Sequence, residues 1–170
     1  MASNDHTPIV KNIAWATEAD TRAFAAALAT RLQRSNAGNL LIQLHGDLGA
    51  GKTTFVRHLL QALGVTGRIK SPTYAVVEPY AVDESSGKAL DIWHFDFYRF
   101  SNPREWEDAG FRDIFASPGL KLAEWPGKAA GHVPVADLSL TIGTMTDESR
   151  QVVLMAGTSK GAAMLRELGA

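Results

Sequence analysis

A glycine-rich segment between an apolar run and an amphipathic stretch constrains this chain more than any other feature. Residues 46–54 read Gly-Asp-Leu-Gly-Ala-Gly-Lys-Thr-Thr and match the phosphate-binding loop pattern G-x-x-x-x-G-K-[ST], the Walker A motif. Residues 40–44 before it are mostly apolar and predict a buried strand. The stretch after it predicts a helix at 53–63 that Gly64 ends, because its apolar residues recur at helical spacing.

The residue types of this segment suit the chemistry of polyphosphate binding. Glycines let successive backbone N–H groups curl around phosphates without a Cβ clash, and the start of the helix adds positive potential. Lys52 is placed to reach the β- and γ-phosphates, and the Thr53 hydroxyl is placed to ligate Mg²⁺. The pattern therefore predicts binding of a nucleoside triphosphate with Mg²⁺. The residues expected around the phosphates are Asp47, Leu48, Gly49, Ala50, Gly51, Lys52, Thr53 and Thr54.

Composition limits the classes of protein that remain. The chain has 170 residues with 45% hydrophobic and 21% charged residues, which predicts one soluble globular domain over 1–170. Its net charge of −1 argues against an independent nucleic-acid binder, so no DNA partner is expected. It contains no cysteine, which excludes disulfides and Cys-ligated zinc. Because no apolar stretch approaches the length of a membrane span, we expect a cytoplasmic protein without a membrane partner.

The order of the expected elements predicts an α/β fold with a phosphate-loop NTPase-like mixed sheet flanked by helices. The expected strands cover residues 9–14, 40–44, 73–77, 89–98, 120–124, 138–142 and 151–155. The expected helices begin near Thr17 and cover 53–63, 103–110 and 159–168. Polar turns at 83–87 and 147–149 predict antiparallel hairpins, one on either side of residues 120–124.

Two carboxylates stand at the ends of predicted strands. Asp96 ends the run Ile-Trp-His-Phe-Asp and shares a face with His94, so it is a candidate Walker B acid; the alternative is a solvated charge at a strand end. Glu124 precedes Trp125 and Pro126, and the proline ends its strand. Since ligands of open α/β sheets bind beyond the carboxyl ends of strands, Glu124 is a second candidate for the metal site.

Two further side chains have a functional and a plain interpretation. Trp125 could stack on a base or pack beneath a loop. Thr73, in Lys-Ser-Pro-Thr-Tyr, is placed like the switch threonine of GTPases, which contacts the γ-phosphate and Mg²⁺, or it belongs to an ordinary turn before a strand.

Taken together, these motifs resemble the TsaE (YjeE) family, the bacterial ATPases needed to make threonylcarbamoyladenosine in tRNA. The resemblance rests on the loop at 46–54, Ser-Pro-Thr-Tyr at 71–74, His-Phe-Asp-Phe-Tyr-Arg at 94–99 and Glu-Trp-Pro at 124–126. It runs in order from about residue 17 to about residue 131, and the last 40 residues resemble the family in layout only.

The resemblance implies a role for each matching residue. Lys52 and the loop backbone would hold the phosphates of ATP, and Thr53, Asp96 and Glu124 would lie at Mg²⁺. Thr73 matches the switch-like threonine of the family, Trp125 the tryptophan beside the site and Thr21 a threonine near the nucleotide. The family acts with TsaD and TsaB, where TsaD is the transferase. This chain would then be an accessory ATPase that meets tRNA only through that complex.

Other classes of phosphate-loop protein fit less well. A small GTPase needs the N-K-x-D and D-x-x-G motifs, and both are absent from the sequence. A small-molecule or nucleotide kinase is the stronger alternative, but kinases commonly neutralise the transferred phosphoryl group with clustered arginines. The arginines after Asp96 are scattered in sequence: Arg99, Arg104, Arg112, Arg150 and Arg166. A third class is a nucleotide-gated binding module with negligible catalysis, which differs from a partner-dependent ATPase only in how much ATP it hydrolyses.

Overall fold

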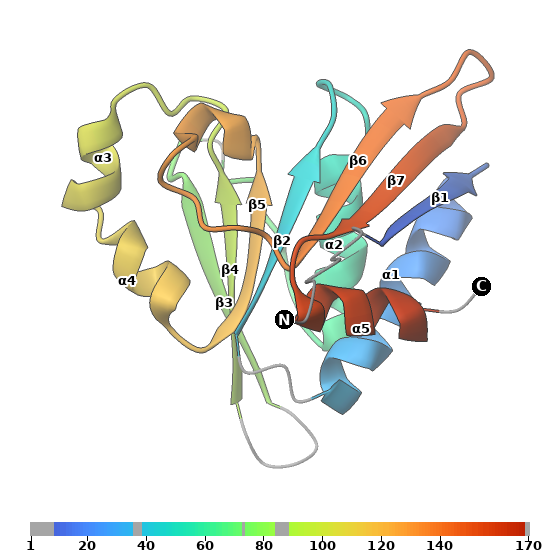
Figure 1. Ribbon diagram of the computed structural model, residues 1–170, viewed down its shortest axis with the longest axis horizontal. Coiled ribbons are helices and arrows are strands. Elements are labelled where there is room, and N and C mark those ends of the chain that lie inside the picture. Colours follow the sequence, from blue (N-terminus) through green and yellow to red (C-terminus); the bar gives the residue numbers. More distant parts are fainter. Residues whose placement is uncertain (1–8, 36–38, 73, 84–88, 169–170) are drawn as a thin grey trace, which may run out of the picture.

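The computed structural model describes residues 9–35, 39–72, 74–83 and 89–168, whose strands form one mixed sheet (Figure 1). The sheet has seven strands in the order β1-β7-β6-β2-β5-β4-β3. Three neighbouring pairs are parallel: β6–β2, β2–β5 and β5–β4. The other three pairs, β1–β7, β7–β6 and β4–β3, are antiparallel. The strands are β1 Val10–Trp15, β2 Asn39–His45, β3 Val77–Asp83, β4 Ala89–Asp96, β5 Gly119–Glu124, β6 Leu138–Thr144 and β7 Arg150–Ala156.

Helices cover both faces of the sheet, and Figure 1 shows α3 and α4 on the side away from α1 and α2. Alternate residues of each inner strand therefore enter different cores. Leu40 and Ile42 of β2 pack with α1, α2 and α5, whereas Leu41 packs with the aromatic residues around α3 and α4. The helices are α1 Glu18–Ser35, α2 Lys52–Leu63, α3 Pro103–Asp108, α4 Phe111–Ala116 and α5 Ser159–Glu167, with a 3₁₀ turn η1 at Pro126–Ala129. Among the described helices, none is both long and apolar enough to cross a membrane.

The predicted fold class is confirmed, and the phosphate loop follows the strand at the centre of the sheet. Both predicted hairpins are confirmed as antiparallel pairs, β3–β4 and β6–β7. The expected turn at 83–87 falls mostly outside the described residues.

One predicted strand was misplaced and one helix was missed. Residues 74–76 are not extended, because Val76 has a φ of 66° and its N–H donates to the Pro72 carbonyl at 3.2 Å. β3 therefore begins only at Val77, and Pro79 is tolerated in it because β3 is an edge strand. The missed helix, α4, starts after Gly110 in the left-handed conformation.

The C-terminal helix is tied to the centre of the sheet through Asp137. The Thr158 side chain caps α5 by accepting from the Gly161 N–H at 3.1 Å, and its hydroxyl donates to Asp137 Oδ1 at 2.7 Å. Asp137 Oδ2 in turn accepts from the backbone N–H of Leu41 in β2 at 2.8 Å.

Thr158→Ala is expected to lower the free energy of unfolding by about 1–2 kcal/mol, since it removes a helix cap and a partner of Asp137. Urea unfolding followed by circular dichroism measures this change. Thr158→Ser keeps the hydroxyl and should retain most of the stability. Equal stability of the alanine variant and the wild type would show that the cap contributes nothing.

Candidate functional site

The phosphate loop connects the central strand β2 to α2 and depends on glycine for its path. Gly46, Gly49 and Gly51 have φ angles of 144°, 79° and 111°, which side-chain-bearing residues rarely adopt. A Cβ added to Gly46 would lie 2.5 Å from the Ile142 carbonyl oxygen of β6, so a larger residue there would push the loop from the sheet. The loop is thereby held against the strand that neighbours β2 on one side.

Lys52 is the cation inside this loop. Its side chain is only 5% exposed, and Nζ donates to the carbonyl oxygens of Gly46 and Asp47, the latter at 2.9 Å. Burial lowers the pKa of Lys52, and the carboxylates of Glu124, Asp96 and Asp47 oppose that shift. The ammonium group therefore lies where a phosphate oxygen could replace a loop carbonyl as its partner.

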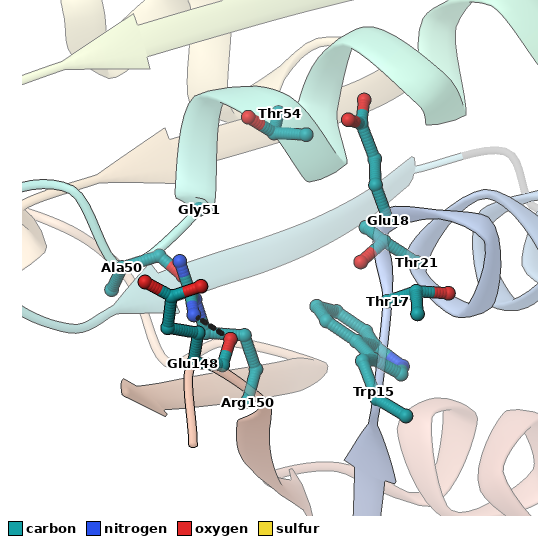
Figure 2. A pocket seen from close by; sticks show the side chains of 10 residues that line it. Trp15, Thr17, Glu18, Thr21, Ala50, Gly51, Thr54, Glu148 and Arg150 are labelled. Atoms are coloured by element: carbon teal, nitrogen blue, oxygen red, sulfur yellow. Dashed lines mark hydrogen bonds between the residues drawn. The ribbon is translucent and has the colours of Figure 1, made fainter. Parts of the chain in front are cut away.

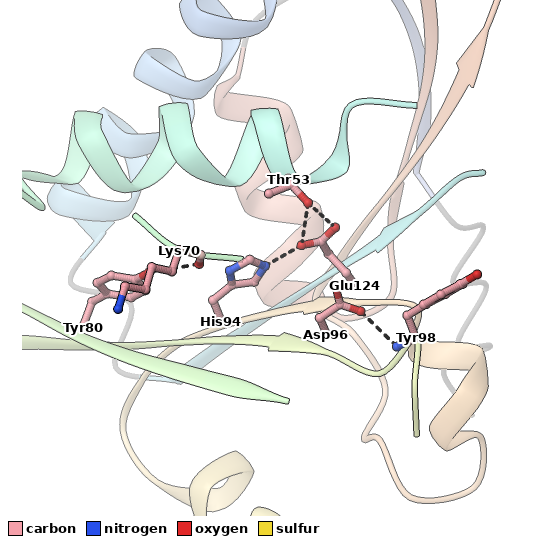
Figure 3. A network of polar contacts seen from close by, with 7 residues as sticks. All are labelled: Thr53, Lys70, Tyr80, His94, Asp96, Tyr98 and Glu124. Carbon is pink, nitrogen blue, oxygen red and sulfur yellow. Dashed lines mark hydrogen bonds and ion pairs between the residues drawn. The ribbon is translucent and has the colours of Figure 1, made fainter. Parts of the chain in front are cut away.

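Glu124 joins the helix start to the middle of the sheet (Figure 3). The Thr53 hydroxyl donates to its carboxylate, with distances of 3.0 Å to Oε1 and 3.3 Å to Oε2. On the other side, Nε2 of His94 hydrogen bonds to Oε2 at 2.5 Å. Glu124 is 1% exposed and His94 is fully buried, and the buried His94 Nδ1 has no hydrogen-bond partner among the described residues. The predicted partners Thr53 and Glu124 are thus brought together across 71 residues of sequence.

Asp96 lies beside Glu124, because the two residues are register partners of the parallel strands β4 and β5. Its Oδ1 accepts from the Tyr98 N–H at 2.9 Å, and its own N–H donates to the Val76 carbonyl at 2.8 Å. Burial raises the pKa of Asp96, with a further contribution from the charge of Glu124. The carboxylate is half-buried, in place of the solvated strand end that was the alternative. Thr73 lies outside the described residues.

A cavity of about 180 Å³ opens on one side of the loop (Figure 2). The end of β1 and the start of α1 form one wall, which includes Trp15 and Thr21. Gly51 and Thr54 line it from the loop and α2, and Arg150 lines it from β7. Thr21, the residue singled out by resemblance alone, is therefore on the cavity that adjoins the start of α2.

Trp125 lies on the other side of the loop. The Lys52 Nζ is 4.2 Å from the centre of its ring, and the ring also contacts Tyr98 at a centroid distance of 5.0 Å. Trp125 has a φ of 54°, which is unusual for a bulky residue. It lines a second cavity of about 450 Å³ with Asp47 and Lys128. Trp125 and Thr21 thus face different cavities, and Trp125 contacts the phosphate-loop lysine.

The donors present fit a polyphosphate with a divalent cation. The N–H groups of Lys52, Thr53 and Thr54 belong to the first turn of α2 and have no carbonyl partner within the helix, and Gly51 at its cap has no side chain. Within the described part of the chain, no group of three His, Cys, Asp or Glu side chains could hold a metal ion. A cation at Thr53 and Glu124 would take its remaining ligands from phosphates and water, which is typical of Mg²⁺.

Sequence reasoning missed the structural partners of these residues. His94 was noticed only for sharing a face with Asp96, although it contacts Glu124 directly. Arg150 was considered only as one of the scattered arginines, yet its Nε donates to the Ala50 carbonyl in the loop at 2.8 Å. Neither contact has a local sequence signal, because each depends on the order of the strands.

Comparison with known proteins gives a consistent result. Residues 15–152 match the family model "Threonylcarbamoyl adenosine biosynthesis protein TsaE". The chain is 43% identical over 122 residues to the tRNA threonylcarbamoyladenosine biosynthesis protein TsaE of Haemophilus influenzae, covering 72% of this chain and 73% of that protein. It is 31% identical over 128 residues to the protein of the same name from Bacillus subtilis, covering 75% and 77%. The crystal structure of Bacillus subtilis YdiB superposes with a TM-score of 0.70 and 27% identity, covering 94% of this chain and 95% of that one.

Proposed function

Because the chain belongs to the TsaE family of tRNA threonylcarbamoyladenosine biosynthesis, we propose that it binds and hydrolyses ATP in support of this tRNA modification. The main observation behind the proposal is the hydrogen bond between the Thr53 hydroxyl and the Glu124 carboxylate. It lies next to a phosphate loop whose carbonyl oxygens accept hydrogen bonds from Lys52. These are the groups that ATP and Mg²⁺ need on the same side of the loop.

The residues of the loop would bind the phosphates. The backbone of residues 47–54 and the Lys52 ammonium group would surround them, and the nucleoside would enter the cavity that Thr21 and Thr54 line. Mg²⁺ would be held by Thr53 with Glu124 and Asp96, and when bound it neutralises charge on the phosphate oxygens.

The surrounding side chains then have distinct roles in hydrolysis. The hydrogen bond from His94 to the Glu124 carboxylate fixes the orientation of that carboxylate, which keeps it in contact with the Thr53 hydroxyl. Asp96, held by the Tyr98 N–H, would lie at the metal beside Glu124. Trp125 covers Lys52 from the side opposite the nucleoside cavity and would limit the access of bulk water there. Thr73 would contact the γ-phosphate and Mg²⁺, as implied by the resemblance.

We propose further that this ATPase works with the TsaD and TsaB proteins, and that TsaD is the transferase. The proposal rests on the family membership of the chain. Two arginines have contacts that engage them elsewhere: Arg99 lies over the Tyr74 ring at 4.6 Å, and the Arg150 Nε donates to the Ala50 carbonyl of the loop. A small-molecule or nucleotide kinase is the alternative that an experiment must separate.

The test adds this chain to TsaD, TsaB, tRNA, a preformed activated threonylcarbamoyl donor and γ-labelled ATP with Mg²⁺. We expect modified tRNA to accumulate in excess over TsaD only when the chain is present, with the label released as inorganic phosphate. Multiple turnovers without the chain would overturn the accessory role. In a parallel reaction of the chain and labelled ATP with a cell extract, transfer of the label to a small molecule would instead support the kinase.

A further inference from the structure

The side chain of Arg150 extends from the β6–β7 hairpin to the phosphate loop, and it has no role in the function proposed above. Arg150 is the first residue of β7, and its Nε donates to the carbonyl oxygen of Ala50 at 2.8 Å. The two residues are 100 positions apart in sequence. Figure 2 shows the Arg150 side chain extending from the sheet to the loop at the edge of the nucleoside cavity.

The guanidinium group is fixed at its other edge by the hairpin itself. Arg150 NH1 donates to the Glu148 carbonyl at 2.5 Å, and Glu148 has a φ of 68°. The backbone of Arg150 is paired with Trp15 of β1 and with Thr144 of β6. Arg150 is therefore a rigid bridge between the sheet and the loop, in contrast to a long side chain that is free at the surface.

The bridge sets the direction of a peptide group inside the loop. The peptide bond between Ala50 and Gly51 is trans, so its C=O and N–H point in opposite directions. With the Ala50 carbonyl held by Arg150, the Gly51 N–H points away from β7. The Ala50 N–H is held as well, since it donates to the Asp47 carbonyl at 3.1 Å. Gly51 has a φ of 111° and, as a glycine, has no side chain that could restrain this peptide.

We propose that Arg150 is a positioning residue for nucleotide binding: it holds the Ala50 carbonyl so that the Gly51 N–H is aimed at the phosphates. The C-terminal hairpin thereby sets the affinity of the loop for ADP and ATP. This inference rests on the proposed nucleotide binding. It assigns a role to a residue near the end of the segment 15–152 that the family model matches.

Three substitutions separate the hydrogen bond from the positive charge. In Arg150→Gln the amide Nε2 occupies the same position along the side chain as the arginine Nε, so the bond to Ala50 is kept without the charge. Arg150→Lys keeps the charge but has a methylene group at that position. Arg150→Met removes both and retains a similar length. Arg166→Met on α5 is the matched control, because it removes an exposed arginine away from the loop.

The measurement is calorimetric titration of each variant with ADP and Mg²⁺, together with the melting temperature of the unliganded protein. We expect the Met and Lys variants to bind ADP about tenfold more weakly and the Gln variant to retain most of the affinity. The Arg166→Met control should bind as the wild type does. If Arg150 had only a structural role, the variants would have lower melting temperatures, but the Gln variant would not bind ADP more tightly than the Lys and Met variants.

Several outcomes would overturn the proposal. Wild-type affinity in both Met and Lys variants would show that the bridge does not position the loop. If Arg150→Lys retained the affinity for ADP and Arg150→Gln lost it, the effect would come from the positive charge and not from the hydrogen bond. If the Met variant fails to fold, the comparison of Gln with Lys still decides between these results. A wild-type protein that does not bind ADP contradicts the proposed function itself, which is a different result from equal binding by all variants.

Discussion

Lys52→Ala is expected to reduce ATP hydrolysis by about a hundredfold or more. Lys52 is the only lysine or arginine in residues 46–54. Its ammonium group donates to two loop carbonyls at the start of α2. Removing one preorganised donor to charge that develops on reacting oxygens commonly lowers kcat by this amount. Phosphate release measured with TsaD and TsaB present tests the expectation, since turnover is proposed to depend on these partners.

Arg34→Ala is the control for removing one surface cation, because Arg34 is exposed and lies in the last turn of α1, away from the loop. Its rate should equal that of the wild type. The melting temperature of the Lys52 variant should also be measured, because the Gly46 and Asp47 carbonyls lose a partner. Unchanged hydrolysis by a folded Lys52→Ala protein would contradict the assignment of the phosphate loop.

The parts of the fold that the sequence predicted are those with local causes. The loop, α2 and the β6–β7 hairpin each have their signal within a few consecutive residues, in glycine spacing, helical periodicity or a polar turn. The start of β3 was misjudged because Val76 takes a left-handed conformation, which β-branched residues rarely adopt and no local pattern indicates.

The arrangement of the candidate site depends on strand order, which the sequence does not encode locally. Glu124 meets Thr53 because β5 lies directly beside β2, and Asp96 meets Glu124 because β4 lies directly beside β5. Sequence analysis identified each carboxylate from its position at a strand end. It could not identify His94 as the hydrogen-bond partner of Glu124, because the contact between these two side chains depends on which strand lies beside which.

The placement of Trp125 shows the same limit. Its sequence position after Glu124 indicated a place near the site, and left open whether the ring would stack on a base or pack beneath a loop. In the structure the ring lies over Lys52 and faces a cavity different from the one lined by Thr21. Trp125 has a φ of 54° at the turn between β5 and η1, a conformation that no local pattern in the sequence indicated.

Glu124→Gln is expected to lower Mg²⁺-dependent turnover by about a hundredfold while leaving most of the Mg²⁺-free affinity for ADP. Glutamine has the shape of glutamate and can still bond to the Thr53 hydroxyl and to His94 Nε2, so the buried network is retained. What is lost is the negative charge, and a hard cation such as Mg²⁺ prefers a carboxylate ligand. The loop and Lys52, which are proposed to bind the phosphates, are unchanged.

The glutamine substitution is more informative than Glu124→Ala. Alanine would leave the fully buried His94 without the partner of its Nε2 atom, in addition to the unpartnered Nδ1, and this should lower stability by about 1–3 kcal/mol. A loss of activity in the alanine variant would then mix unfolding with chemistry. Glu105→Gln, on exposed α3 away from the loop, is the control for removing one negative charge.

The measurements that test Glu124 are phosphate release as a function of Mg²⁺ concentration and calorimetric titration with ADP, with and without Mg²⁺. The wild type and Glu105→Gln should bind ADP more tightly with Mg²⁺ than without it, and Glu124→Gln should lose most of this difference. If Glu124→Gln keeps the full Mg²⁺ dependence of both binding and turnover, the carboxylate serves only as a buried acceptor for Thr53 and His94, and the metal site must lie elsewhere.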